Sequence, residues 1–113
     1  MRAAAIAALA CALALPAAAA PPPSGLELYT RPDKGHCIAC HQVPAGAGPA
    51  TRSDLGPRLE GARMRDLGKA RLREVIVDPT RLNPDTVMPP YGRHHILDKG
   101  EIDQLVEYLY ALP

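Results

Sequence analysis

Two cysteines and a histidine lie within five consecutive residues of this chain, in the order Cys37-Ile38-Ala39-Cys40-His41. The remaining cysteine, Cys11, lies far upstream. Two thiols at this spacing form a disulfide, bind a metal or attach a group covalently. Each of these outcomes fixes the backbone near residue 37, and the rest of the chain must fold around that fixed point.

Residues 1–19 have the layout of a secretory signal peptide. Arg2 supplies the positive charge, residues 3–15 form an uninterrupted apolar run, and small residues suited to cleavage follow. The run is too short to span a bilayer, which needs about 20 residues. We therefore expect export to the periplasm, no membrane span, and a mature domain at residues 20–113. A lipoprotein signal at Cys11 is the weaker alternative, because the residue three positions before it is not leucine.

The charge balance of the expected mature chain excludes one class of partner. The whole sequence has 13 Lys and Arg against 12 Asp and Glu, and removal of Arg2 lowers the first count to 12. A chain without net charge creates no field that attracts nucleic acid or an anionic lipid surface. We expect neither as a partner.

The composition leaves the core short of large side chains. The sequence contains no Phe, no Trp and only 4 Tyr, whereas Pro and Gly number 13 and 9. Small domains with so little apolar material need a covalent or metal-based support. A haem would supply a large apolar body around which helices can pack.

The Cys37 to His41 string is typical of covalent haem attachment, in which two thiols bond the porphyrin and the following imidazole ligates its iron. A thioredoxin-like dithiol is the main alternative, although no βαβ pattern accompanies the cysteines. A zinc site would need two more ligands, which would have to come from His36, His94 and His95. We favour one haem c, bonded to Cys37 and Cys40 and ligated by His41.

Four side chains are candidates for the second iron ligand: Met64, Met88, His94 and His95. Met88 precedes two prolines, which stiffen the backbone and remove nearby amide donors. Met64 lies between two arginines, so we expect it to be partly exposed. The adjacent histidines are typical of a surface. We therefore expect Met88 to be the ligand, and ligation by one His and one Met raises the reduction potential.

The Gly56-Pro57-Arg58-Leu59 stretch is expected beside the haem. A metal-bound imidazole usually donates its other N–H to a carbonyl or carboxylate, and Pro57 offers a carbonyl without an amide hydrogen. We count Pro57 and Leu59 among the cofactor-binding residues. An ordinary Gly-Pro turn is the alternative interpretation.

Helical patterns dominate the rest of the chain. We predict a short helix at residues 26–30, a helix at 69–77, and a last helix that Asp98 and Glu101 begin in the manner of a capping box. Residues 55–61 are expected to form turns. No alternating strand pattern occurs, so the fold is predicted to be all-α with long loops. The apolar stripe of the last helix comprises Ile102, Leu105, Val106, Leu109 and Leu112.

Several of these strings together resemble the SoxX cytochromes of the bacterial sulfur-oxidising system. They cover nearly the whole expected mature chain, and the most discriminating are the Asp-Pro and Asn-Pro pairs and the Met-Pro-Pro-Tyr-Gly string. The matching stretches are Lys34 to His41, Leu55 to Gly61, Arg71 to Arg73, Asp78-Pro79, Asn83-Pro84, Thr86 to Gly92 and Glu101-Ile102.

The resemblance implies a class I cytochrome c fold and a single haem with His41 and Met88 as iron ligands. It also implies a SoxA-like cytochrome subunit as partner in a heterodimer, a SoxYZ-like carrier protein and a downstream electron acceptor. Such a complex couples thiosulfate oxidatively to a carrier cysteine, as an L-cysteine S-thiosulfotransferase, with the sulfur chemistry assigned to the partner subunit. The alternative is a free periplasmic cytochrome that shuttles electrons between larger redox proteins.

Overall fold

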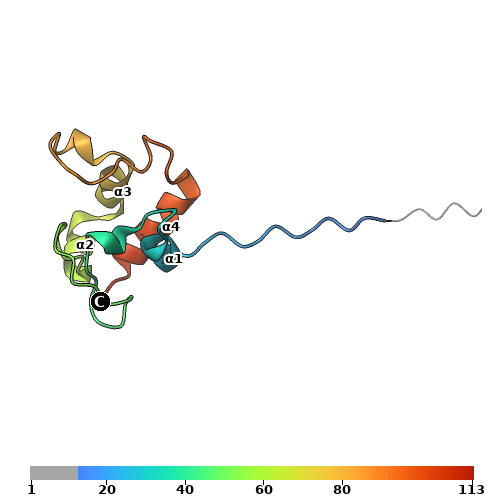
Figure 1. Cartoon of the computed structure of the whole chain (residues 1–113), viewed down its shortest axis with the longest axis horizontal. Coiled ribbons are helices and arrows are strands. Elements are labelled where there is room, and N and C mark those ends of the chain that lie inside the picture. Colours follow the sequence, from blue (N-terminus) through green and yellow to red (C-terminus); the bar gives the residue numbers. More distant parts are fainter. Residues whose placement is uncertain (1–12) are drawn as a thin grey trace, which may run out of the picture.

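The computed structural model describes residues 13–113. The predicted signal peptide at 1–19 therefore lies mainly outside the described residues, and it stays a prediction. Residues 13–24 have no regular secondary structure and lead, largely exposed, into the first helix (Figure 1).

Four α-helices and two short 3₁₀ helices make up the described part of the chain, which contains no strand. The predicted all-α architecture with long loops is confirmed. The elements are α1 (Gly25–Thr30), η1 (Cys37–Ala39), α2 (Gly61–Leu67), α3 (Lys69–Val77), η2 (Pro79–Arg81) and α4 (Lys99–Tyr110).

Helix α4 is the central element, because it packs against α1, α2 and α3. The predicted capping box is present at its start: Asp98 Oδ1 accepts from the Glu101 amide at 2.8 Å, and Glu101 Oε2 accepts from the Asp98 amide at 2.9 Å. The predicted apolar stripe is buried along its whole length, to Leu112. The other three α-helices therefore rest on α4, and η1, which begins at Cys37, contacts α1.

Helix α1 crosses α4 at very short range. A Cβ atom on Gly25 would lie 2.5 Å from the backbone oxygen of Gln104, so only glycine permits this approach. The rings of Tyr29 and Tyr108 then pack against each other with centroids 5.6 Å apart. The α1–α4 contact fixes the chain just before the cysteine motif.

Helix α2 was not among the predicted elements. Only Gly61 and Met64 of this helix are buried, and no side chain caps its start at Glu60. The usual sequence signals of a helix, an apolar stripe and a capping residue, are therefore missing, and contacts with α3 and α4 stabilise it instead.

None of the helices in residues 13–113 has the length and apolar character needed to cross a bilayer.

Candidate haem site

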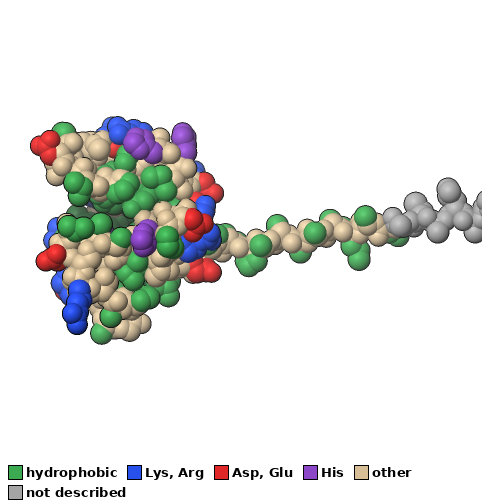
Figure 2. Space-filling view, viewed as in Figure 1, with side chains coloured by type: hydrophobic (Ala, Val, Ile, Leu, Met, Phe, Trp, Pro, Cys, Tyr) green, Lys and Arg blue, Asp and Glu red, His purple; other side chains and the backbone are tan. Residues whose placement is uncertain are grey.

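A cavity of about 450 Å³ opens between α2, α3 and the segment that carries the cysteine motif. Figure 2 shows it as a hollow between the upper and lower parts of the molecule, with hydrophobic side chains at its edges. Its volume falls within the ~300–1,000 Å³ typical of cofactor pockets. Apolar side chains from α3 and α4 form its inner wall, namely Leu72, Val75, Ile76, Leu105 and Leu109.

The two cysteines border this cavity on one side. Cys37 begins the 3₁₀ turn η1, Cys40 follows its end, and the two form no disulfide. Burial raises the pKa of the Cys37 thiol to about 12. A thiol–disulfide exchange protein needs the opposite, a thiol whose pKa is lowered so that the thiolate attacks. The environment of Cys37 therefore speaks against the dithiol alternative.

His41 lies on the cavity wall in a single tautomer. Its Nδ1 is 2.7 Å from the carbonyl oxygen of Pro57. Because a carbonyl only accepts, Nδ1 carries the proton and Nε2 keeps the lone pair that a metal requires. The backbone of His41 is fixed as well, since its own carbonyl accepts a hydrogen bond from the hydroxyl of buried Tyr29 at 2.8 Å.

Gly56 forms the surface behind this imidazole. A Cβ atom on Gly56 would lie 2.7 Å from Nδ1 and 2.8 Å from Nε2 of His41, closer than Cβ atoms come to other heavy atoms. In the sequence, Gly56 is notable only as part of a Gly-Pro string. The contact between Gly56 and His41 has no sequence signal beyond that pair, because it is the loop between the two residues that brings them together.

Met88 also lines the cavity and is half-buried in the loop that follows η2. Its amide donates to Thr86 Oγ1 at 3.2 Å, which holds the local turn. His94 and His95 are exposed and do not line the cavity. The structure thus places Met88, the favoured candidate, beside the same cavity as His41, and the role of both residues as iron ligands stays a prediction.

The expectation that Met64 is partly exposed was wrong. Its side chain is only 3% exposed and lines the cavity from α2. Arg65 points away from the cavity and donates to the carbonyl of Leu112 at 2.7 Å, whereas the exposed Arg63 borders the cavity. Adjacent helical positions differ by about 100°, so Met64 faces the core although Arg65, the next residue, faces outward.

Leu59 lines the cavity and packs against the core, half-buried. Its amide donates to the backbone oxygen of Gln42 at 2.8 Å, which joins the Gly56–Leu59 stretch to the residue after His41. Pro57 and Leu59, which we predicted to bind the cofactor, are therefore held next to the cysteine motif.

Two cations border the cavity, Arg63 from α2 and Arg71 from α3. Arg71 donates to Glu74 at 2.7 Å, whereas Arg63 makes no ion pair within the described part of the chain. Among residues 13–113, no carboxylate side chain lines the cavity. Since haem bears two carboxylates on one edge, positive charge at the mouth suits it.

The residues present fit a covalent haem. The cavity combines two thiols, an imidazole with a free Nε2, the thioethers of Met64 and Met88, and an apolar wall. Across residues 13–113, no three His, Cys, Asp or Glu side chains gather in a way that would hold a metal ion, which leaves the zinc alternative without a ligand set.

Comparison with known proteins agrees with this site. Over residues 20–109 the sequence matches the family described as cytochrome C oxidase, cbb3-type, subunit III. The chain belongs to this cytochrome c family. A cytochrome c domain holds haem covalently, and in this family member Cys37, Cys40 and His41 form the string that fits the attachment. No curated protein sequence matches the chain significantly.

The fold of this cytochrome c domain is also found in a solved structure, described as the crystal structure of SoxXA from P. pantotrophus. The two superpose with a TM-score of 0.66 at 23% sequence identity, over 77% of each chain. The predicted class I cytochrome c fold is thereby confirmed. At this identity the likeness concerns the fold.

Proposed function

We propose that this domain carries one haem c and transfers single electrons. The observation that supports it best is the hydrogen bond between His41 Nδ1 and Pro57, because it leaves Nε2 unprotonated beside the two cysteines. Cys37 and Cys40 attach the porphyrin as thioethers, and His41 and Met88 ligate the iron. The haem supplies a centre that changes charge by one electron, and the chain determines its potential and access.

We assign a separate role to each group around the cavity. The Pro57 carbonyl orients the His41 ring and increases its basicity as a ligand. The uncharged thioether of Met88 favours the reduced iron, so the centre accepts electrons readily. The apolar wall excludes water and limits the rearrangement of solvent when the charge changes.

We further propose a SoxX-like role for the chain, as the electron-accepting subunit beside a SoxA-like cytochrome. This role is supported by the fold shared with the P. pantotrophus protein and by the sequence strings that resemble SoxX. In the reaction, thiosulfate and the thiol of a SoxYZ-like carrier form a new S–S bond and release two electrons and one proton. The electrons pass through the haem one at a time to a downstream acceptor.

The chain itself offers no nucleophile for that sulfur chemistry. Once Cys37 and Cys40 are thioethers, residues 20–113 contain no further thiol. The S–S bond must therefore form on the partner or the carrier. We also propose export to the periplasm, directed by the apolar leader at residues 1–19.

Co-purification under native conditions tests the assignment to a complex. We expect the haem-bearing chain to elute together with a second, SoxA-like cytochrome after affinity purification from periplasmic extract. Elution of the chain alone at its native abundance would contradict the complex and would favour the free electron shuttle. A pyridine haemochrome spectrum on the same fractions tests the haem separately, since both roles require it.

A further inference from the structure

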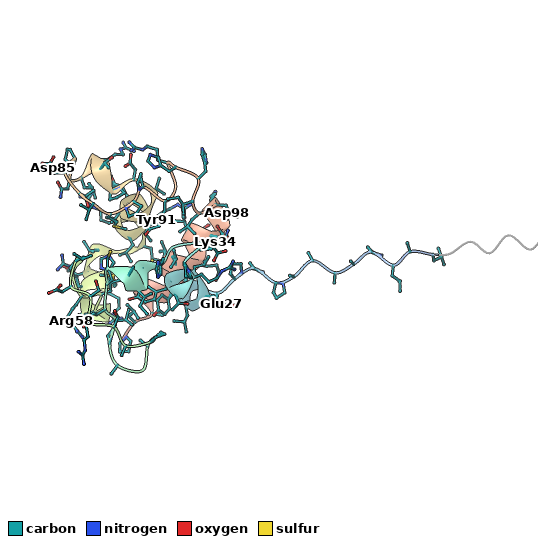
Figure 3. The ribbon with its side chains drawn as sticks, in the orientation of Figure 1. Glu27, Lys34, Arg58, Asp85, Tyr91 and Asp98 are labelled. Atoms are coloured by element: carbon teal, nitrogen blue, oxygen red, sulfur yellow. The ribbon has the colours of Figure 1, made fainter. Side chains whose placement is uncertain are left out.

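The loop that carries Met88 is closed at its base by contacts at the end of α3. Residues 79–91 leave α3 after Asp78 and return at Gly92. Figure 3 shows Asp85 at the outer end of this loop and Tyr91 at its inner end. We call residues 79–91 the Met88 loop.

The backbone makes the first part of the closure. The carbonyl of Val77 accepts two hydrogen bonds, from the amide of Gly92 at 3.1 Å and from the amide of Arg93 at 3.0 Å. Gly92 lies so close that a Cβ atom there would be 3.0 Å from Val77 Cα. The two ends of the Met88 loop are therefore held in direct contact.

A buried carboxylate makes the second part. The Asp78 side chain is 9% exposed, and its Oδ1 accepts from the hydroxyl of Thr80 at 2.5 Å and from the Thr80 amide at 3.2 Å. Its Oδ2 lies 3.4 Å from Nη1 of Arg93. Asp78 thus contacts the outgoing segment of the loop through Thr80 and the returning segment through Arg93.

We propose that Asp78 and Arg93, with the Val77 carbonyl, form a buckle that holds the Met88 loop over the cavity and so keeps Met88 in place as an iron ligand. Asp78 and Arg93 are positioning residues, because neither lines the cavity. The inference rests on the proposed role of Met88. It adds that the strength of Met88 ligation is determined about ten residues away, at the base of the loop.

Competition by imidazole measures the strength of the buckle. An external ligand binds the iron only when Met88 has moved away, so its apparent dissociation constant equals the intrinsic value divided by the fraction of open loop. In the haem-loaded ferric protein, the near-infrared band of sulfur–iron ligation reports the bound Met88. Imidazole titration of this band gives the apparent affinity.

We expect Asp78→Ala, which removes all three side-chain contacts, to bind imidazole about tenfold more tightly than the wild type, since charge-assisted hydrogen bonds are lost from the closed loop alone. Asp78→Asn keeps the acceptor for Thr80, and its imidazole affinity should fall between those of Asp78→Ala and the wild type.

Arg93→Gln changes an exposed side chain, so it is expected to fold and to shift the affinity in the same direction by a factor of roughly 3. The matched control is Asp33→Asn, which breaks the exposed pair with Arg31 outside the loop and should leave imidazole binding unchanged.

A general loss of stability would lower the denaturation midpoint without changing imidazole affinity in buffer. Unchanged affinity in Asp78→Ala and Arg93→Gln, in proteins that retain the band, would overturn the buckle alone. The assignment of Met88 requires a sulfur–iron band in the wild-type protein that is lost in Met88→Ala. If this is not observed, both the assignment of Met88 and the buckle are wrong.

Discussion

The imidazole of His41 lies against the backbone of Gly56, where a Cβ atom would fall 2.7 Å from Nδ1 and 2.8 Å from Nε2 of the ring. We predict that Gly56→Ala displaces the ring and breaks its hydrogen bond to Pro57. Overpacking of this kind costs about 1–3 kcal/mol. The expected result is a lower yield of haem-loaded protein with a weakened low-spin absorbance spectrum.

Gly100→Ala is the matched control for this substitution, because the Cβ atom would meet nothing closer than Asp98 Oδ1 at 3.4 Å. It should leave yield and spectrum unchanged. A Gly56→Ala protein with the spectrum of the wild type would contradict the close-packed account of His41.

The two cavity methionines are predicted to differ when each is changed to alanine. Met88→Ala should lose the near-infrared sulfur–iron band and lower the reduction potential, because the neutral thioether is gone. Met64→Ala should keep the band and instead lose about 2–5 kcal/mol of unfolding free energy, since Met64 is 3% exposed and leaves a cavity. Absorbance, potentiometry and denaturant unfolding separate the two. Loss of the band in Met64→Ala instead of Met88→Ala would make Met64 the ligand, and a wild-type protein without the band would direct attention to His94 or His95.

Tyr91 is predicted to make stability decline in alkali. Burial against the cavity raises its pKa from 10.0 to about 12. The unfolded chain then loses this proton at lower pH than the folded chain, so the stabilisation is complete below pH 10 and is lost as the pH rises to 12. After solvent screening, the decline should be on the order of 1 kcal/mol. Denaturant unfolding should be measured between pH 9 and 12, at steps of about 1 pH unit. We expect the free energy of unfolding of Tyr91→Phe to decline less than that of the wild type. Identical declines in the two proteins would refute the assignment.

Arg63 is predicted to raise the reduction potential. It lines the cavity without an ion-pair partner in the described residues, and a nearby positive charge stabilises the reduced centre. Arg63→Gln should lower the potential by on the order of 0.5 kcal/mol of reduction free energy, because the side chain is exposed. Arg52→Gln, at an exposed position outside the cavity, serves as the control. Equal potentials in the two variants would show that Arg63 does not act on the haem.

The parts of the fold that could be predicted are those with local signals. Residues 69–77 and the start of the last helix carry an apolar period, a helix-ending Asp-Pro pair and a capping box, and the structure has these elements at the predicted positions. The acceptor role of Pro57 was also within reach, because a metal-bound histidine needs such a partner.

The rest depends on contacts between residues distant in the sequence. Helix α2 and the burial of Met64 follow from packing against α3 and α4. Residues 61–67 contain no capping residue or apolar stripe that would predict them. The Asp78–Arg93 pair joins residues across a loop, and sequence periodicity gives no sign of it. Such contacts decide the shape of the cavity wall, so the wall could not be predicted even where the attachment motif was clear.

Mass spectrometry of the exported protein tests the central claim most directly. The account predicts a polypeptide that begins near residue 20 and carries the added mass of one haem, retained after denaturation and located on the peptide with Cys37 and Cys40. An intact mass equal to that of the amino acids alone, with two free thiols on that peptide, would contradict it.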